Sequence, residues 1–383
     1  MSAQPNVQRN STRRQFLAQA AAGGVGLTLS RTVLAVDPLT TLPADQRTNI
    51  YFEKKLKAMR LGLYRHPPVD IIKDGFRPVG SKIADFAVIH HQGREHFFYI
   101  DRRLQEGTPF FPGHEIFFGH ASTADFFDWT VHDPVMLIRP GTWEGAHVWA
   151  PFVLRDGDRY VMIYTGLNDA LAQDLGLAFS KNLFHWDRWE GNPISPLKNA
   201  EWAAWWPDEI CSCRDPFMMR RDGRYYVTFT ANTKEGASCV ALASSADLKT
   251  WNDHGPILVG PRTGYEPSMW GGHTQGSCES TVLLQRGDRW FLLVGVKMYQ
   301  KPGGFYIFIS DRMDRFDFSK AALFFNGGIC EIVRNDGDRS LMAGGVGGHI
   351  KFGEVNWSDP QPRLVEITRE HLVKWQSVKP LVE

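Results

Sequence analysis

The sequence has no excess of charge of either sign and no long hydrophobic run. Its 383 residues contain 43 Lys and Arg against 42 Asp and Glu, a net charge of +1. Nucleic acids and anionic membranes usually require a strong basic excess, so neither is expected as a partner. No uncharged apolar run reaches the roughly 18 residues that a membrane-spanning helix needs. With 43% hydrophobic residues, the chain is expected to be globular and to form a core.

Several catalytic motifs are also missing, and cysteine is scarce. The sequence contains no nucleophile elbow, no phosphate-cradling glycine loop and no HExxH zinc helix. Its five cysteines include no CxxC pair, which argues against a zinc–thiolate site. The odd count means that at least one thiol is free or pairs between chains. Cys213 and Cys278 could be buried packing residues or could form a disulfide between neighbouring repeats.

The N-terminus has the pattern of an export signal. Arg13 and Arg14 precede an uncharged stretch from Phe16 to Ser30 that is rich in Ala, Gly and Leu, and small residues follow near Ala35. This order predicts a twin-arginine signal peptide over residues 1–35, and hence a periplasmic or secreted protein. An ordinary amphipathic N-terminal helix is the alternative.

The rest of the chain is rich in glycine, proline and aromatic residues, and it repeats. A glycine that introduces an aromatic or apolar run recurs at Gly93, Gly157, Gly223, Gly287 and Gly337. Each copy predicts a β-hairpin. A Ser or Thr with an aromatic residue six positions later recurs with a similar period, at Thr123, Ser180, Ser245 and Ser310.

Two marks with one period predict an all-β fold, a five-bladed β-propeller over residues 79–383. A β-sandwich with coincidental spacing is the alternative. Residues 36–78 are expected to form an N-terminal extension, with helix over about Asp45–Met59. A further helical turn is predicted near Thr368–Leu372.

An alignment of the repeats on their hairpin glycines indicates a candidate site. Eight residues before the five hairpin glycines stand Asp85, Trp149, Asp215, Glu279 and Ile329. In a propeller, the starts of the innermost strands face the central channel at one end, so three of these positions would bring carboxylates together. Buried acids cost several kcal/mol unless they are paired or used. We therefore predict that Asp85, Asp215 and Glu279 are catalytic, although exposed turn residues remain the alternative for each one alone.

Three converging carboxyls suit glycoside hydrolysis. The reaction needs one acid for the leaving oxygen and one base or nucleophile on the other side of the sugar. A third negative charge raises the pKa of the acid and keeps it protonated. Three carboxylates could equally bind calcium through their oxygens. Trp149 is expected to stack on a sugar ring.

Three motifs carry a family resemblance. Trp149-Ala150-Pro151, Arg214-Asp215-Pro216-Phe217 and Glu279-Ser280 resemble motifs of the five-bladed propeller glycosidases of families 43 and 32, the arabinanase, levansucrase and invertase group. The resemblance covers about residues 79–357. It implies that Asp85 is the base or nucleophile, that Asp215 orients the sugar and tunes pKa values, and that Glu279 is the general acid. Arg214 would contact a substrate hydroxyl or Asp215.

Some residues separate the two families. The sequence lacks the Trp-x-Asn-Asp-Pro-Asn box typical of family 32, and the box at Trp149 favours family 43. His349 resembles a channel histidine of family 43 that bears on a metal. No cofactor is expected to be required, and a structural calcium ion in the central channel is a further expectation. The residues expected to bind substrate are Trp149, Arg214, His147, Trp270 and His273.

The function predicted from the sequence is an exported glycoside hydrolase. It would cleave furanosidic or xylosidic linkages in oligo- or polysaccharides with the three channel carboxylates. A glycoside phosphorylase is one alternative, and it would need Arg and His to hold phosphate beside one acid. A propeller that binds sugar or a protein without catalysis is another, because one fold supports many functions. The sequence leaves the oligomeric state open.

Overall fold

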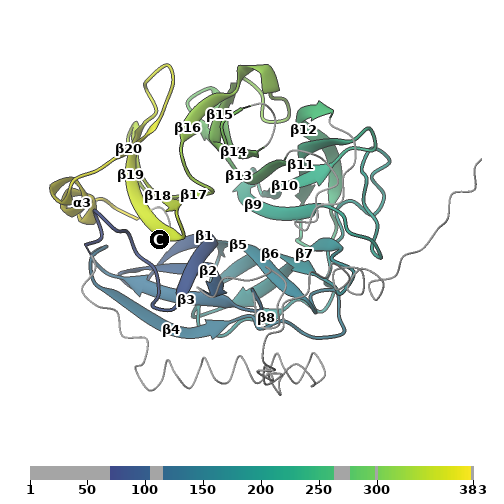
Figure 1. The fold of residues 1–383 in the computed structure, drawn as a ribbon, viewed down its shortest axis with the longest axis horizontal. Helices are drawn as coiled ribbons and strands as arrows, with labels where there is room; N and C mark the ends of the chain where they lie inside the picture. Colours follow the sequence, from purple (N-terminus) through teal and green to yellow (C-terminus); the bar gives the residue numbers. More distant parts are fainter. Residues whose placement is uncertain (1–69, 104–114, 263–276, 298–300, 381–383) are drawn as a thin grey trace, which may run out of the picture. The chain divides into compact units, whose positions relative to one another are not determined.

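The computed structural model describes residues 70–103, 115–262, 277–297 and 301–380 (Figure 1). The chain divides into two units, Met1–Leu42 and Pro43–Glu383, and every described residue lies in the second. The predicted signal peptide and the helix expected over Asp45–Met59 lie outside the described residues.

Five antiparallel sheets of four strands make up the fold, and in each sheet the strands pair in chain order. The strands of blades I, II and III are β1 (Ser81–His91), β2 (Arg94–Arg103), β3 (Phe118–Thr123), β4 (Trp129–Val135), β5 (His147–Asp156), β6 (Arg159–Leu167), β7 (Gln173–Ser180), β8 (Asp187–Arg188), β9 (Cys213–Arg221), β10 (Arg224–Asn232), β11 (Ala237–Ser245) and β12 (Asn252–Arg262). Those of blades IV and V are β13 (Ser277–Arg286), β14 (Arg289–Lys297), β15 (Gly304–Ser310), β16 (Ala322–Phe325), β17 (Cys330–Asp336), β18 (Arg339–Val346), β19 (His349–Asn356) and β20 (Leu364–Glu366). The prediction of a five-bladed β-propeller is confirmed.

The first strand of each blade is the innermost. Figure 1 shows β1, β5, β9, β13 and β17 around the centre of the ring, with the later strands of each blade farther out. This order brings segments that are far apart in the sequence to one central region. Side chains at the starts of the inner strands can therefore meet, although they come from different repeats.

Both sequence marks correspond to turns. The five hairpin glycines have φ between 57° and 75°, a region that glycine enters without steric cost, as tight hairpin turns require. The Ser or Thr mark begins a turn that side-chain oxygens close. Ser180 Oγ accepts from the backbone N–H of Leu183, and Ser245 Oγ accepts from that of Leu248. In the same turn the Trp186 indole donates to the Leu183 carbonyl, which explains the aromatic residue six positions on.

The core lies between the blades. Five clusters of buried apolar side chains fill the fold, and each combines residues of two neighbouring blades. In the cluster between blades II and III, for example, Leu177 packs with Phe229, and both are completely buried. Because each blade is covered on both sides, its strands read as nearly continuous apolar runs.

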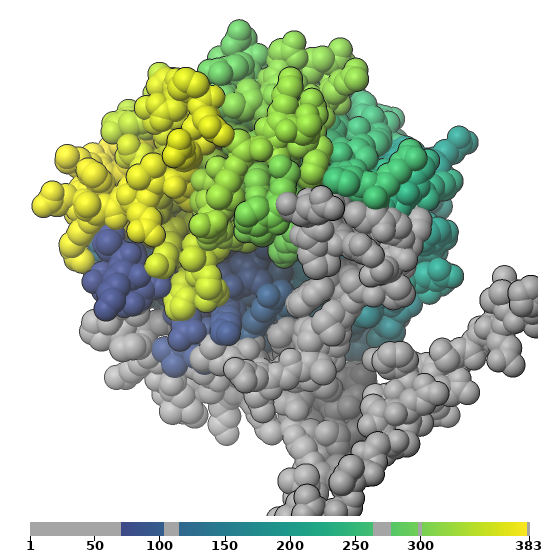
Figure 2. Space-filling view, turned by 45° about the horizontal axis from the view of Figure 1, so that its top comes forward, coloured from purple at the N-terminus to yellow at the C-terminus, as the bar shows by residue number. Residues whose placement is uncertain are grey.

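The ring closes between blade V and blade I, which lie side by side in Figure 2. The four strands of each described blade are consecutive in the chain, so blades V and I do not exchange a strand where they meet. Other contacts must therefore hold these two blades together. Phe76 pairs with Ile350 in an isolated antiparallel bridge. Helix α3 (Arg369–Gln376), which confirms the helical turn expected near its start, buries Trp375 in the cluster shared by these two blades. Arg334 of β17 forms a buried ion pair with Glu95 of β2 (2.8 Å).

The structure decides whether the cysteines form a disulfide, and it shows the character of the described helices. All five cysteines are buried and free, so the disulfide between Cys213 and Cys278 does not form and the interpretation as packing residues is confirmed. Among the described residues, no helix has the length and apolar character to cross a bilayer.

Candidate active site

Each of the first four inner strands carries a β-bulge near its start. The pairing with the second strand of the blade skips two residues between Ile83 and Phe86, Trp149 and Phe152, Arg214 and Phe217, and Glu279 and Val282. At a bulge two residues oppose one on the partner strand, which re-aims their side chains. The predicted acids lie in or beside these bulges.

The bulges correct the alignment of the repeats. The count from the hairpin glycines put Asp85, Asp215 and Glu279 at one equivalent position, and this was wrong. Glu279 directly precedes its bulge, Asp215 is the first bulged residue and Asp85 is the second. The count fails because the glycine is the second loop residue in blades I and III but the first in blade IV. In addition, the part of the inner strand between the bulge and the hairpin loop is one residue longer in blade I than in blade III.

The three carboxyls nevertheless meet, because two residues connect them. The Arg214 guanidinium lies 3.1 Å from Glu279 Oε2 and 3.5 Å from Asp215 Oδ2. The Ser280 backbone N–H donates to Asp215 Oδ2 (3.1 Å), and the Ser280 hydroxyl donates to Asp85 Oδ1 (3.4 Å). Acids from blades I, III and IV therefore share one buried polar network. The structure thus brings the three predicted catalytic residues together.

Unusual backbone conformations hold this network in place. Asp215 and Ser280 are the first bulged residues of their strands, with φ of 57° and 54°. Such left-handed conformations cost a non-glycine residue about 1–3 kcal/mol and concentrate at functional sites. The Asp215 N–H donates to Thr165 Oγ1 of blade II (3.0 Å), so the neighbouring blade fixes this turn.

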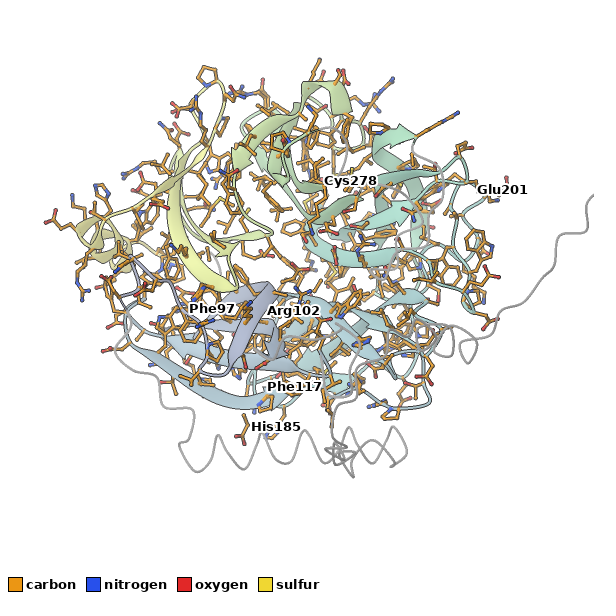
Figure 3. The ribbon with its side chains drawn as sticks, in the orientation of Figure 1. Phe97, Arg102, Phe117, His185, Glu201 and Cys278 are labelled. Atoms are coloured by element: carbon orange, nitrogen blue, oxygen red, sulfur yellow. The ribbon has the colours of Figure 1, made fainter. Side chains whose placement is uncertain are left out.

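Two further cations border the acids, and the sequence analysis missed both. Lys297, at the end of β14, donates to Glu279 Oε1. Arg102, near the end of β2 and labelled in Figure 3, donates to the buried carboxylate of Glu115 and also interacts electrostatically with Asp85 and Glu279. Neither lies in a recognisable motif, since each reaches the site only because its strand ends beside an inner strand.

Burial and mutual repulsion set the protonation of Asp85 and Asp215. Burial raises the pKa of Asp85 to about 8, and the negative charges of Asp215 and Glu279 add to this rise. Burial also raises the pKa of Asp215 to about 6, against the lowering effect of Arg214. At neutral pH the site therefore holds a proton on Asp85.

Glu279 behaves in the opposite way. Burial alone would raise its pKa, but Lys297 and Arg214 together outweigh burial and lower the pKa of Glu279 to about 2. In the substrate-free protein Glu279 is thus ionised and Asp85 protonated. This is the reverse of the distribution implied by the roles that the family resemblance gives to these two residues.

A fourth carboxyl lies close to Asp85. Glu331 of blade V is buried, and burial together with the charge of Asp85 raises its pKa well above the ordinary value. The count from the hairpin glycine pointed to Ile329 in this blade, two residues away. Glu331 escaped notice because it lies six residues before the hairpin glycine, whereas the count looked eight residues back.

The residues predicted to bind substrate have different surroundings. Trp149 is only 6% exposed and its ring lies against His147 (5.8 Å between centroids), so a sugar could meet only a small part of its face. In the part of the chain that the structure describes, its buried indole N–H has no hydrogen-bond partner. Arg214 contacts Asp215, which was one of its two predicted contacts. Trp270 and His273 lie outside the described residues.

The chemistry of the site does not favour calcium. Arg214 and Lys297 already neutralise Glu279, and Arg214 lies beside Asp215. The charges that act on the His349 ring are those of Arg77, Lys351 and Asp74, and none of the three acids is among them. Calcium prefers several free carboxylate or carbonyl oxygens, which this cation-rich arrangement does not offer.

Residues 86–270 match the family model of the glycosyl hydrolases family 32 N-terminal domain. The matched segment includes Arg214 and Asp215, but it begins after Asp85 and ends before Glu279.

Individual relatives agree with this match. A probable sucrose-6-phosphate hydrolase of Psychromonas ingrahamii is 24% identical over 221 residues, which cover 56% of this chain and 36% of the relative. The chain therefore aligns with little more than a third of that curated relative. Among solved structures, the family 32 β-fructofuranosidase of Bombyx mori has a TM-score of 0.59 at 15% identity, covering 84% of this chain and 70% of its own. The endo-arabinase of Bacteroides thetaiotaomicron has a TM-score of 0.54 at 13% identity, covering 77% and 98%.

The predicted resemblance to the five-bladed propeller glycosidases of families 32 and 43 is confirmed. Structures of both groups share the fold, and the matching family model supports the assignment to the glycosidase class. The preference for family 43, which rested on the box at Trp149, is not supported, since the matching model is that of family 32. The missing Trp-x-Asn-Asp-Pro-Asn box shows only that the first-blade motif differs here.

Proposed function

We propose that this protein is an exported glycosidase that hydrolyses β-fructofuranosidic bonds in sucrose-like sugars or fructans. The observation that carries the proposal is the buried network in which Arg214 and Ser280 join Asp85, Asp215 and Glu279. The preference for fructose over arabinose or xylose rests on the family 32 match and on relatives named as sucrose-6-phosphate hydrolase and β-fructofuranosidase.

In this proposal Asp85 and Glu279 are the reacting pair. One carboxylate attacks the sugar or activates water, and the other carboxyl protonates the leaving oxygen. Asp215, held by Arg214 and by the backbone of Ser280, positions a sugar hydroxyl and keeps negative charge beside both partners. Hydrogen bonds to this buried carboxylate would strengthen as positive charge develops on the sugar ring.

Lys297 and Arg214 lower the pKa of Glu279, while burial raises that of Asp85. While the Lys297 ammonium group pairs with Glu279, Glu279 is ionised and the proton stays on Asp85. If Glu279 is the general acid, as the family resemblance implies, Lys297 must release Glu279 when the sugar enters. The side chain of Lys297 is 57% exposed, so it has room to move towards solvent.

Replacement of Lys297 by Met tests this requirement. Loss of the cation raises the pKa of Glu279, since Lys297 is the strongest of the charges that lower it. With Glu279 as general acid, the alkaline limb of the pH profile of kcat/KM should move to higher pH. With Glu279 as base or nucleophile, the acid limb should move to higher pH instead. Lys351→Met, which removes a lysine whose ammonium group donates to the Lys73 carbonyl, should leave both limbs in place.

The substrate is tested with a panel of glycosides. Sucrose, 1-kestose, inulin and levan would be incubated with the protein beside aryl α-L-arabinofuranosides and β-D-xylosides. We expect release of fructose from at least one of the first four and no turnover of the other two. Cleavage of an arabinofuranoside or xyloside without cleavage of any fructoside would contradict the proposed substrate class while leaving the three-carboxylate site intact.

The site geometry favours hydrolysis over the two alternatives. A phosphorylase needs a cation cluster free to bind phosphate, whereas Arg214, Lys297 and Arg102 each already pair with a carboxylate. A binding-only propeller has no need for buried acids with pKa values pushed as far apart as those of Asp85 and Glu279, a separation typical of acid–base pairs. Unchanged hydrolysis rates in the presence of phosphate would separate hydrolase from phosphorylase.

Export through the twin-arginine route is the remaining part of the proposal, supported by Arg13, Arg14 and the uncharged segment that follows them. Replacement of both arginines by lysine should leave the chain in the cytoplasm as an uncleaved precursor. Cell fractionation with immunoblotting measures this directly, and Arg9→Lys is the control that should export normally. Periplasmic chain at wild-type levels in the double variant would contradict the proposed route.

A further inference from the structure

Three histidines meet on blade I, outside the proposed active site. His96 lies on β2, His120 on β3 and His132 on β4. The strand register places His120 directly opposite His132, and His96 opposite Ser122, two residues along from His120. All three side chains are therefore on one face of the sheet. Their candidate ligand nitrogens lie within 4.8 Å of one another, and His96 Nδ1 is 2.9 Å from His120 Nε2. We call these residues the histidine trio.

Comparison with the other blades shows how unusual these residues are. His120 stands three residues before the Ser or Thr mark, where blades II, III and IV have Leu177, Leu242 and Ile307, all essentially fully buried. His96 stands opposite the residue before that mark, where the same blades have Val161, Tyr226 and Phe291. Both positions thus belong to the packing surface between neighbouring blades. Blade I places two imidazoles where the repeat otherwise uses almost only apolar side chains.

Two members of the trio, His96 and His120, are buried at a cost that packing alone does not explain. His120 is fully buried, and its Nδ1 has no hydrogen-bond partner among the described residues. An unpaired buried polar atom is destabilising, and leucine at this position would avoid that cost. Phe98 stacks on the His120 ring (4.5 Å), and Phe184 of blade II lies 5.0–5.8 Å from all three rings. The trio is thus a nitrogen-rich pocket with aromatic walls.

We propose that the histidine trio binds one divalent transition-metal ion of the zinc or copper(II) type. Neutral imidazole nitrogens are the preferred ligands of these ions, whereas calcium and magnesium require oxygens. Three imidazoles complete three positions of a tetrahedral zinc site and leave the fourth to water. Among the described residues, this is the one group of three His, Cys, Asp or Glu whose ligand atoms come this close together. The ion would tie three strands of blade I together beneath Phe184.

The surroundings supply a feature that such a site needs. Ser122 Oγ lies 2.8 Å from His132 Nε2 and holds that ring in place. Outer contacts of this kind orient ligating histidines.

Blade III contains a natural control. Ser244 Oγ lies 2.8 Å from His254 Nε2, at the positions that correspond to Ser122 and His132. The other two positions of this blade are Tyr226 and Leu242. The Ser–His pair thus occurs in blade III without the other two histidines, and metal binding should depend on the two additional histidines of blade I.

The test is a metal titration of the full chain, prepared without a polyhistidine tag and stripped with a chelator. Zinc would be titrated against a chromophoric competitor, and copper(II) binding would be followed by electron paramagnetic resonance. We expect one zinc ion per chain with a dissociation constant in the micromolar range or below, a zinc-dependent rise in Tm, and a copper spectrum with splittings from nitrogen ligands. His120→Leu, which copies blades II and III, should weaken zinc binding at least tenfold.

Control variants make the outcome decisive. His254→Gln should bind zinc like the wild type, and so should Asp85→Asn, which separates the trio from the acids of the proposed active site. His132→Gln, a change at a less buried ring, should also lose affinity, so the test does not depend on the folding of one variant. Absence of zinc binding by the wild type, or equal binding by wild type and both trio variants, would overturn the proposal.

Discussion

Asp85→Asn and Glu279→Gln should each lower kcat at least about a hundredfold on the best fructoside, since general acid–base groups contribute roughly 10²–10⁴-fold. Each replacement keeps the shape of the side chain but removes either the nucleophile or the exchangeable proton. Glu279→Gln also leaves Lys297 and Arg214 without their anion. Initial rates of fructose release measure the effect.

A matched control separates this loss from a general effect of changing a buried acid. Asp174 is buried in blade II and carries a pKa raised by burial to about 7, but it bonds to Ser195 rather than to the three acids. Asp174→Asn should retain activity within a few-fold. Retention of wild-type rates by Glu279→Gln, with the fold intact, would place the active site elsewhere.

Arg334→Met should destabilise the fold by about 3–5 kcal/mol, the usual cost of breaking a buried ion pair from one side. The guanidinium bonds to Glu95 of blade I, and it also donates to the carbonyls of Trp375, Gln376 and Val378. It therefore connects β17, β2 and the segment after α3 where the ring closes. Its loss leaves the Glu95 carboxylate buried without this guanidinium. Chemical unfolding measures the change in the free energy of unfolding.

Arg339 provides the comparison for this prediction. It pairs with Asp336 on the same β-hairpin of blade V (2.8 Å), and both side chains are about half exposed. Such surface pairs contribute about 0–1 kcal/mol, so Arg339→Met should change stability little. Equal effects of Arg334→Met and Arg339→Met would show that the closing contact does not stabilise the ring.

The number of blades could be predicted from the sequence because each blade repeats the same two kinds of turn. Hairpin glycines such as Gly223 need positive φ, and the Ser or Thr turns need side-chain acceptors, so both leave residue signatures at every copy. The exact register could not be predicted. Bulges and hairpin loops each shift it by one residue, and these shifts have no signature in a single sequence.

The candidate site could be predicted from the sequence where it depends on motifs. It could not be predicted where it depends on contacts between strands and between blades. The three acids could be found because their strands begin near the channel. Ser280 and Glu331 act through proximity to acids of other blades, and Lys297 reaches Glu279 from the neighbouring strand of its own blade; only the folded chain creates these contacts. The protonation pattern followed the same rule, since burial raises the pKa of Asp85 while Lys297 and Arg214 lower that of Glu279.

The most direct test of the account is a double-variant comparison of activity. Hydrolysis of a β-fructofuranoside would be measured for the wild type, Asp85→Asn, Glu279→Gln and the combined variant. Residues that act as one catalytic unit give strongly non-additive effects. The account predicts turnover by the wild type, large losses in both single variants and no substantial further loss in the double variant. A double variant whose loss equals the product of the single losses, or a wild type that cleaves no glycoside, would contradict it.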